Sequence, residues 1–198
     1  LNIIGANRFH HILLHHASSK RVFLTIPDDV RGELKQFAKD ERLFPRFKTA
    51  MVDAGKLRET LSEAVMMGLV EEVLNEYNTW SPDSVMLEGV PDESSTLNTF
   101  LLRHSDVFSE LTELKGYRGV TYRTEISGKA IYPEATDLDI YRLATHLASL
   151  PLTNIGAVLV ATMDGDFTLV DRAIEEQFGF SIAKNHRSLK PWLKAQKA

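Results

Sequence analysis

The 198-residue chain contains no cysteine. Disulfide bonds, thiolate zinc sites and cysteine nucleophiles are therefore excluded, and a chain without disulfides fits a cytoplasmic protein. The sequence also lacks any apolar run near the ~20 residues that cross a bilayer, and no secretory signal is visible, so we expect no membrane partner. Hydrophobic residues still make up 43% of the chain, which is enough for a packed core.

Charge is unevenly distributed along the chain. The formal net charge is −4, but the basic C-terminal tail, residues 184–198, has five basic residues and no acid, so the rest of the chain carries −9. We interpret this tail as a candidate contact for phosphate groups. The alternative interpretation is a frayed, solvated end.

Apolar periodicity and turn residues predict alternating strands and helices. Such alternation is typical of the α/β class, here a three-layer α/β/α sandwich with a central, mostly parallel sheet of about five strands. We expect a single domain over 1–198, with a helical insertion at about 45–130. The predicted strands are 1–4, 22–26, 157–162 and 180–182, with a short strand or ordered loop in 116–128. The predicted helices are 6–17, 30–39 with its opening at Pro27-Asp28-Asp29, 55–77, 136–150 and 167–178, the last stopped by Gly179. One or two further helices are predicted over 95–114.

The acidic residues form the most informative pattern. Asp137 and Asp139 begin a predicted helix, whereas Asp164 and Asp166 follow the predicted strand 157–162. In a parallel sheet, ligands bind beyond the carboxyl ends of the strands, where these carboxylates would gather and repel one another. A hard divalent cation such as Mg²⁺ or Mn²⁺ prefers oxygen ligands and would relieve the repulsion. The sequence therefore predicts an acidic metal site at this edge.

Each acid also has a simpler interpretation. Asp137 could only complement the dipole of its helix, and Asp164-Gly165-Asp166 could be a turn after a strand. Glu33, on the predicted helix 30–39, could be an ordinary solvated residue. The combination of these acids at one edge favours a site over the separate interpretations.

Four segments of the sequence, taken in order, carry a shared pattern. They are Leu1-Asn2-Ile3-Ile4-Gly5-Ala6-Asn7-Arg8-Phe9, Thr25-Ile26-Pro27 with Val30 and Glu33, Asp137-Leu138-Asp139-Ile140 with Ala144, and Leu159-Val160-Ala161-Thr162-Met163-Asp164-Gly165-Asp166-Phe167. These segments resemble the motifs of the PIN-domain nucleases, a family of metal-dependent enzymes that includes ribonuclease toxins of bacterial toxin–antitoxin pairs and RNA-processing factors. The last segment is the most specific, because it is similar to the family's Thr-x-Asp-x-Asp-Phe ending. Residues from about 45 to 130 match no motif.

The resemblance implies an endoribonuclease that hydrolyses RNA phosphodiester bonds with Mg²⁺ or Mn²⁺. It also implies an antitoxin protein or a second copy of the chain as partner. The implied catalytic and metal-binding residues are Glu33, Asp137, Asp164 and Asp166. Residues implied to orient ligands or water are Asn7, Thr162 and Asp139, and those implied to contact RNA are Arg8, Lys184 and Arg187.

One departure from the family pattern concerns its first catalytic aspartate, which falls at Gly5. Glycine offers no ligand, so metal binding should be weaker. Three explanations are open: a deliberate substitution that disables the enzyme, a naturally inactive relative, or partial compensation by Asp139 or another acid.

Two further functions remain open from the sequence. The chain could be a catalytically inactive PIN-like module that binds RNA or protein, which Gly5 favours. It could also be a metal-dependent hydrolase of small phosphoesters built on the same acidic edge.

Four histidines share the predicted helix 6–17. His11 and His15 have the i, i+4 spacing that suits a metal, but no glutamate stands beside the first histidine as in zinc proteases. The adjacent pairs, His10 with His11 and His15 with His16, should also face different directions. The sequence therefore does not favour a metal site on this helix.

Overall fold

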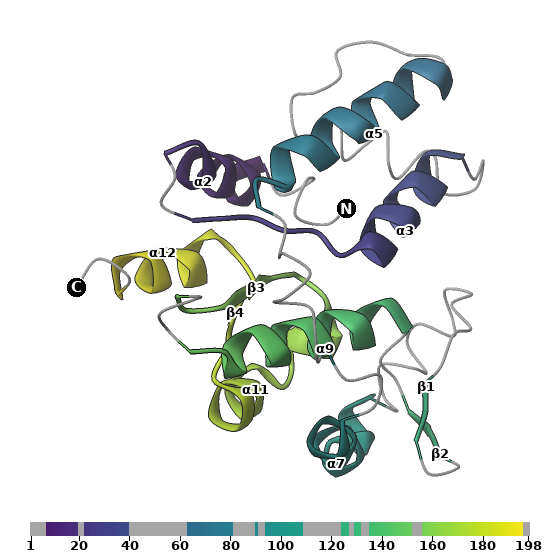
Figure 1. Cartoon of the computed structure of the whole chain (residues 1–198), viewed down its shortest axis with the longest axis vertical. Coiled ribbons are helices and arrows are strands. Elements are labelled where there is room, and N and C mark those ends of the chain that lie inside the picture. The colour runs from purple at the N-terminus through teal and green to yellow at the C-terminus, as the bar shows by residue number, and fades with distance from the viewer. Residues whose placement is uncertain are drawn as a thin grey trace. The chain divides into compact units, whose positions relative to one another are not determined.

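The computed structural model describes residues 7–19, 22–39, 63–80, 90, 94–108, 124–126, 129–131, 135–151 and 156–195. In these ranges most of the chain is helical (Figure 1). The chain divides into two compact units, Leu1–Asp83 and Ser84–Ala198.

The N-terminal unit contains three helices: α2 (Asn7–Ser18), α3 (Asp28–Lys39) and α5 (Glu63–Tyr77). Their apolar side chains recur at helical spacing, so each helix buries one face. The buried residues are Phe9, Leu13 and Ala17 of α2, Leu34 of α3, and Val70, Val73 and Leu74 of α5. The predicted helices at 6–17 and 30–39 are confirmed, as is the described part of the helix predicted at 55–77.

Residues 22–26 of the same unit do not form the predicted strand. The Leu24 N–H donates to Thr79 Oγ1 at 2.9 Å, and the Leu24 carbonyl accepts from the Trp80 N–H at 3.0 Å. The segment therefore satisfies its backbone polar groups on the residues that follow α5. The prediction of a buried strand is therefore wrong here: Phe23 is 66% exposed, the other residues of the segment are half-buried, and local periodicity did not identify the partners of the backbone.

The C-terminal unit alternates helices with short strands. Its elements are α7 (Ser95–Arg103), β1 (Thr124–Ile126), β2 (Lys129–Ile131), α9 (Ala135–Ser149), β3 (Leu159–Ala161), α10 (Gly165–Thr168), α11 (Asp171–Phe178), β4 (Ser181–Ala183) and α12 (His186–Ala195). Strands β1 and β2 pair antiparallel, with Glu125 opposite Ala130.

Strands β3 and β4 pair in parallel and confirm the strands predicted at 157–162 and 180–182. Leu159 lies opposite Ser181 and Ala161 opposite Ala183, and the Thr162 N–H extends the pairing by donating to the Ala183 carbonyl at 3.0 Å. Helices α10 and α11 form the crossover between the two strands. Figure 1 shows α9, α11 and α12 gathered around this pair.

The predicted five-stranded sandwich is wrong. The described ranges hold two sheets of two strands each, β1 with β2 and β3 with β4, in a mostly helical chain. The predicted strand at 22–26 bonds elsewhere, and the predicted strand at 1–4 lies outside the described residues. Apolar runs of four to six residues suit a buried strand and other buried segments equally well, which is why the prediction overcounted strands.

Aromatic side chains dominate the core of the C-terminal unit. Tyr141 of α9 stacks on Phe167 with ring centroids 4.5 Å apart, and both are fully buried. Phe100, Phe108 and Phe180 belong to the same cluster. All of these core residues come from the C-terminal unit.

Gly179 ends α11, as the sequence predicts. It has a positive φ of 75°, and its N–H donates to the Glu175 carbonyl at 3.0 Å. Glycine adopts this left-handed conformation at little cost, so it is a common helix terminator. The helix predicted at 167–178 is in fact two helices, α10 and α11, separated at Leu169 and Val170.

Among the described residues, no helix is both long and apolar enough to cross a bilayer.

Candidate functional site

The predicted acidic residues of the C-terminal unit lie around the end of β3 and the start of α9. Asp137 is in the first turn of α9, where a carboxylate also complements the helix dipole. Asp164 and Asp166 follow β3, in the segment that leads into α10. Sequence reasoning therefore placed these three acids on the correct elements.

Asp164 caps α10. Its Oδ1 accepts a hydrogen bond from the Asp166 N–H at 3.4 Å, and its own N–H donates to Thr162 Oγ1 at 3.0 Å. A side-chain oxygen at this position satisfies a backbone donor that has no partner within the helix. Asp164-Gly165-Asp166 is thus a helix start whose backbone is held by Thr162.

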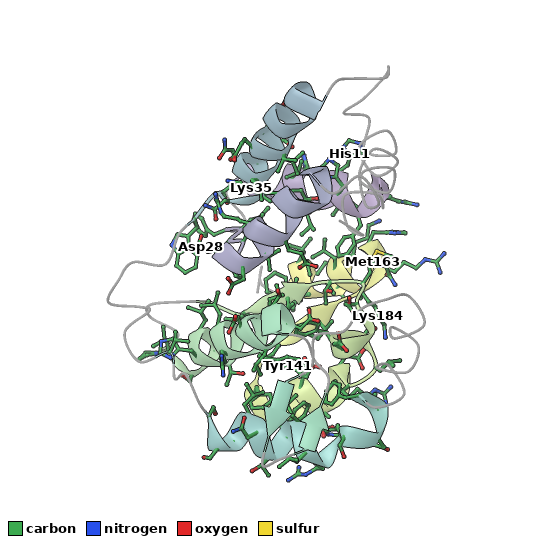
Figure 2. All side chains as sticks on the ribbon, turned by 90° about the vertical axis from the view of Figure 1, so that its right-hand side faces the viewer. His11, Asp28, Lys35, Tyr141, Met163 and Lys184 are labelled. Atoms are coloured by element: carbon green, nitrogen blue, oxygen red, sulfur yellow. The ribbon has the colours of Figure 1, made fainter. Side chains whose placement is uncertain are left out.

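Tyr141 was missed at the sequence level, although it links the acidic segments. Its hydroxyl is buried and donates to the backbone carbonyl of Asp166 at 2.5 Å. Figure 2 shows its place on α9 in the C-terminal unit. The one sequence signal was the helical spacing that puts residue 141 one turn after Asp137.

The pKa of Tyr141 is raised well above its usual value. Burial is the main cause, and the negative charges of Asp166, Asp137 and Asp164 add to it. The hydrogen bond from the Tyr141 hydroxyl to the Asp166 carbonyl joins α9, which carries Asp137, to the segment that carries Asp164 and Asp166.

The three aspartates differ in their access to solvent. Asp166 is fully buried, whereas Asp137 and Asp164 are each partly exposed. Asp166 therefore lies behind the accessible acidic edge. We define the acidic edge as Asp137 and Asp164, with Thr162 beneath Asp164.

Asp139 is turned toward its own helix. Its Oδ1 lies 3.0 Å from Arg142 Nη1, in an ion pair at i, i+3 spacing. Asp139 was considered as a substitute for the metal ligand that is missing at Gly5, but its carboxylate is already paired with Arg142. Gly5 itself lies outside the described residues.

Glu33, Asn7 and Arg8 belong to the N-terminal unit, whereas the acidic edge belongs to the C-terminal unit. Glu33 is exposed on α3, Arg8 is exposed on α2, and Asn7 is the first residue of α2. Their predicted roles at the site stay predictions.

No complete metal cage is formed by the residues the structure describes, because no group of three or more histidine or acidic side chains is close enough to hold an ion. Mg²⁺ does not need such a cage. It keeps several waters and is often held by one or two carboxylates together with the phosphates of a substrate. Asp137 and Asp164 are partly exposed carboxylates, the type of side chain that such an incomplete site uses.

The histidines of α2 differ in their exposure to solvent, as their spacing predicts. His10 is buried and its Nδ1 lies 2.7 Å from the Tyr77 hydroxyl, which ties α2 to α5. Burial, with a smaller contribution from Glu76, raises the pKa of Tyr77 above its usual value. His11 and His15 are exposed.

The two basic candidates near the C-terminus differ in their environments. Lys184 Nζ lies 2.9 Å from Asp171 Oδ2, and this hydrogen bond is the main reason that the pKa of Asp171 is lowered. Arg187 is exposed on α12. Residues 186–195 are helical, so the interpretation of the tail as a frayed end is wrong for that part.

Comparisons with protein-family models, with curated proteins and with solved structures find no match. The residues and their geometry therefore carry the functional argument.

Proposed function

We propose that the chain hydrolyses RNA phosphodiester bonds at the acidic edge with the help of Mg²⁺ or Mn²⁺. The observation that supports this most is the hydrogen bond from Tyr141, one turn after Asp137 on α9, to the carbonyl of Asp166. It joins the two separate segments whose acids were selected from the sequence for this chemistry. The resemblance to PIN-domain nucleases supplies RNA as the substrate and, for a toxin, an antitoxin as partner.

The residues have distinct parts in this proposal. Asp137 and Asp164 would hold the metal, which polarises a phosphate oxygen and lowers the pKa of a water when it is bound. Thr162 fixes the backbone of Asp164. Tyr141 holds the Asp166 carbonyl and so keeps the start of α10 in place.

The decisive experiment is an RNA cleavage assay over a Mg²⁺ titration with matched asparagine variants. We expect Asp137→Asn and Asp164→Asn each to reduce cleavage by about a hundredfold or more, since each removes a charged metal ligand. Asp139→Asn is the control, because it removes the same charge from the same helix and its carboxylate pairs with Arg142. Equal activity in all three variants would exclude the acidic edge as the site.

A second readout does not depend on turnover. A ligand that binds only the folded chain raises its melting temperature. We expect Mg²⁺ to raise the melting temperature of the natural chain and of Asp139→Asn, but not that of Asp164→Asn.

The alternative function is a PIN-like module that binds RNA or protein without cleaving it. It is favoured by Gly5 and by the absence of a three-residue metal group among the described residues. Gly5→Asp separates the two functions. A gain of Mg²⁺-dependent cleavage identifies an enzyme disabled at one position, whereas RNA binding without cleavage in both chains identifies the module. Turnover of small phosphoesters with no effect on RNA would instead identify a phosphatase.

A further inference from the structure

Helix α12 begins with a reciprocal set of hydrogen bonds. Asn185 Oδ1 accepts from the N–H groups of Arg187 at 2.8 Å and Ser188 at 3.1 Å. Ser188 Oγ in turn accepts from the Asn185 N–H at 3.1 Å. This is the arrangement of a capping box, with serine in the place of the usual glutamate. The start and rotation of α12 are therefore well defined.

One side of α12 is buried in the C-terminal unit. Leu189 and Leu193, four residues apart, are 1% and 7% exposed, and the helix packs on β4. Because residues four apart share a face, the apolar side of the helix is already covered by its own unit. It has no apolar face left to insert into a membrane.

A different side of α12 is basic. Arg187, Lys190 and Lys194 are all exposed, and their spacing of three and four residues puts them on one face. None of the three forms an ion pair with another residue in the described part of the chain, whereas Lys184 is paired with Asp171. We call Arg187, Lys190 and Lys194 the basic face.

The basic face begins at the same edge of the strand pair as Asp164. Strands β3 and β4 are parallel, with Ala161 opposite Ala183, so their carboxyl ends coincide. The chain leaves β3 toward Asp164 and leaves β4 toward Asn185 and α12. Arg187 therefore begins a row of cations near the edge from which the chain leaves toward Asp164, and Lys190 and Lys194 continue that row along α12.

We propose that the basic face of α12 binds the phosphate backbone of single-stranded RNA next to the acidic edge. The choice of RNA over another polyanion rests on the proposed function. The charge argument stands by itself, because cations without acidic partners attract polyanions and release their counterions on binding. The proposal replaces Lys184 with Lys190 and Lys194 as RNA contacts, since Asp171 already neutralises Lys184.

The test measures the anisotropy of a fluorescein-labelled, unstructured 20-nucleotide RNA in EDTA, where no metal-dependent cleavage can occur. The variant Arg187→Gln/Lys190→Gln is compared with Arg103→Gln/Arg172→Gln, which removes the same charge from exposed positions of the same unit. For a single strand, each lost phosphate contact lowers the slope of log affinity against log salt by about 0.7, so we expect a decrease of about 1.4 in the first variant. When Lys194→Gln is added to this variant, the total decrease in the slope should be about 2.

The control double variant should keep the slope of the natural chain. Equal effects of the two double variants would show that only total charge matters and would overturn the proposal. Unchanged RNA binding in the triple variant would overturn it as well. Binding of polyglutamate or anionic vesicles with the same dependence on the basic face, but no binding of RNA, would reassign the surface to an acidic protein or a lipid.

Cleavage with Mg²⁺, measured separately, distinguishes the two proposals. Binding that depends on the basic face without any cleavage keeps this inference and refutes the nuclease. If the chain cleaves RNA but its RNA binding does not depend on the basic face, the nuclease proposal is kept and this inference is refuted. Melting temperatures of the variants verify their folding, which exposed substitutions rarely disturb.

Discussion

At the scale of single residues, Tyr141 connects the core of the C-terminal unit with its acidic edge. Its ring stacks on Phe167, while its hydroxyl donates to the Asp166 carbonyl. A buried carbonyl that loses its donor costs more than the bond itself contributes, because the group cannot return to water. The tyrosine hydroxyl thus stabilises the backbone segment that carries two of the three aspartates.

We expect Tyr141→Phe to destabilise the chain by about 1–3 kcal/mol at neutral pH, since the ring is kept and only the hydroxyl is lost. Urea denaturation followed by circular dichroism measures the change. Ser149→Ala is the control on the same helix, because its exposed hydroxyl donates to the His146 carbonyl. The control should change stability by less than about 0.5 kcal/mol. Equal effects of the two variants would contradict the prediction.

The raised pKa of Tyr141 predicts a loss of stability in alkali. In the unfolded chain a tyrosine titrates near pH 10, whereas the folded phenol keeps its proton to a higher pH. Its contribution is fully present below about pH 10 and is lost as the pH rises through the raised pKa of the folded state. The limiting slope for one tyrosine is about 1.4 kcal/mol per pH unit.

Stability measured in urea from pH 8 to pH 11 should therefore fall less steeply in Tyr141→Phe than in the natural chain. Tyr77 also has a raised pKa, so stability should likewise fall less steeply with pH in Tyr77→Phe than in the natural chain. If the free energy of unfolding changed with pH in the same way in all three chains, neither phenol would be linked to folding.

At the scale of secondary-structure elements, the sequence predicted a helix end or a strand correctly where neighbouring residues determine it. Gly179 was predicted to stop a helix and does so with a positive φ, and strand 157–162 was predicted from an apolar run and forms β3. The strand predicted at 22–26 failed because its backbone partners are Thr79 and Trp80, more than fifty residues away. Helix α12 was not predicted, although the Asn185 cap and the four-residue spacing of the buried Leu189 and Leu193 are local signals of a helix.

Two glycine substitutions should change stability in opposite directions. A Cβ at Gly179 or at Gly32 would meet no atom within 4 Å, so only backbone conformation matters. We expect Gly179→Ala to cost about 1–2 kcal/mol, because alanine is disfavoured at positive φ. Gly32→Ala, inside α3, should stabilise by about 0.5–1 kcal/mol, because alanine loses less entropy in a helix. Melting temperatures that shift in the same direction for both variants would contradict this account.

At the scale of the whole molecule, the acidic residues were assigned to elements more accurately than the elements were assigned to a fold. Asp164 and Asp166 were predicted to follow a strand and Asp137 to begin a helix, and the structure has them after β3 and at the start of α9. Their grouping as a metal site stays a prediction. The sheet itself was overestimated, because local apolar runs do not say which segments pair with one another. The burial of Asp166 could not be predicted either, since it depends on α9 packing against the start of α10.

The C-terminal unit should fold without the N-terminal one. Among the described residues, its aromatic core, including Phe100, Tyr141 and Phe180, consists of residues after Ser84. We expect a chain of residues 84–198 to unfold cooperatively in urea and to keep the alkaline transition of Tyr141, since a domain with its own core can fold alone. A gradual loss of the circular dichroism signal, with no sigmoidal transition, would show that the core is incomplete without residues 1–83.

The parallel pairing of β3 with β4 also constrains the order of folding. A parallel pair cannot be closed by a tight turn, so α10 and α11 must first bring Ala183 back beside Ala161. The entropy of closing that loop is lost before any ladder hydrogen bond is gained. Amide protons of the two helices should therefore gain protection from exchange earlier than those of the ladder. The end of the strand pair, from which the chain leaves toward Asp164 and toward α12, would then be among the last parts of the unit to assemble.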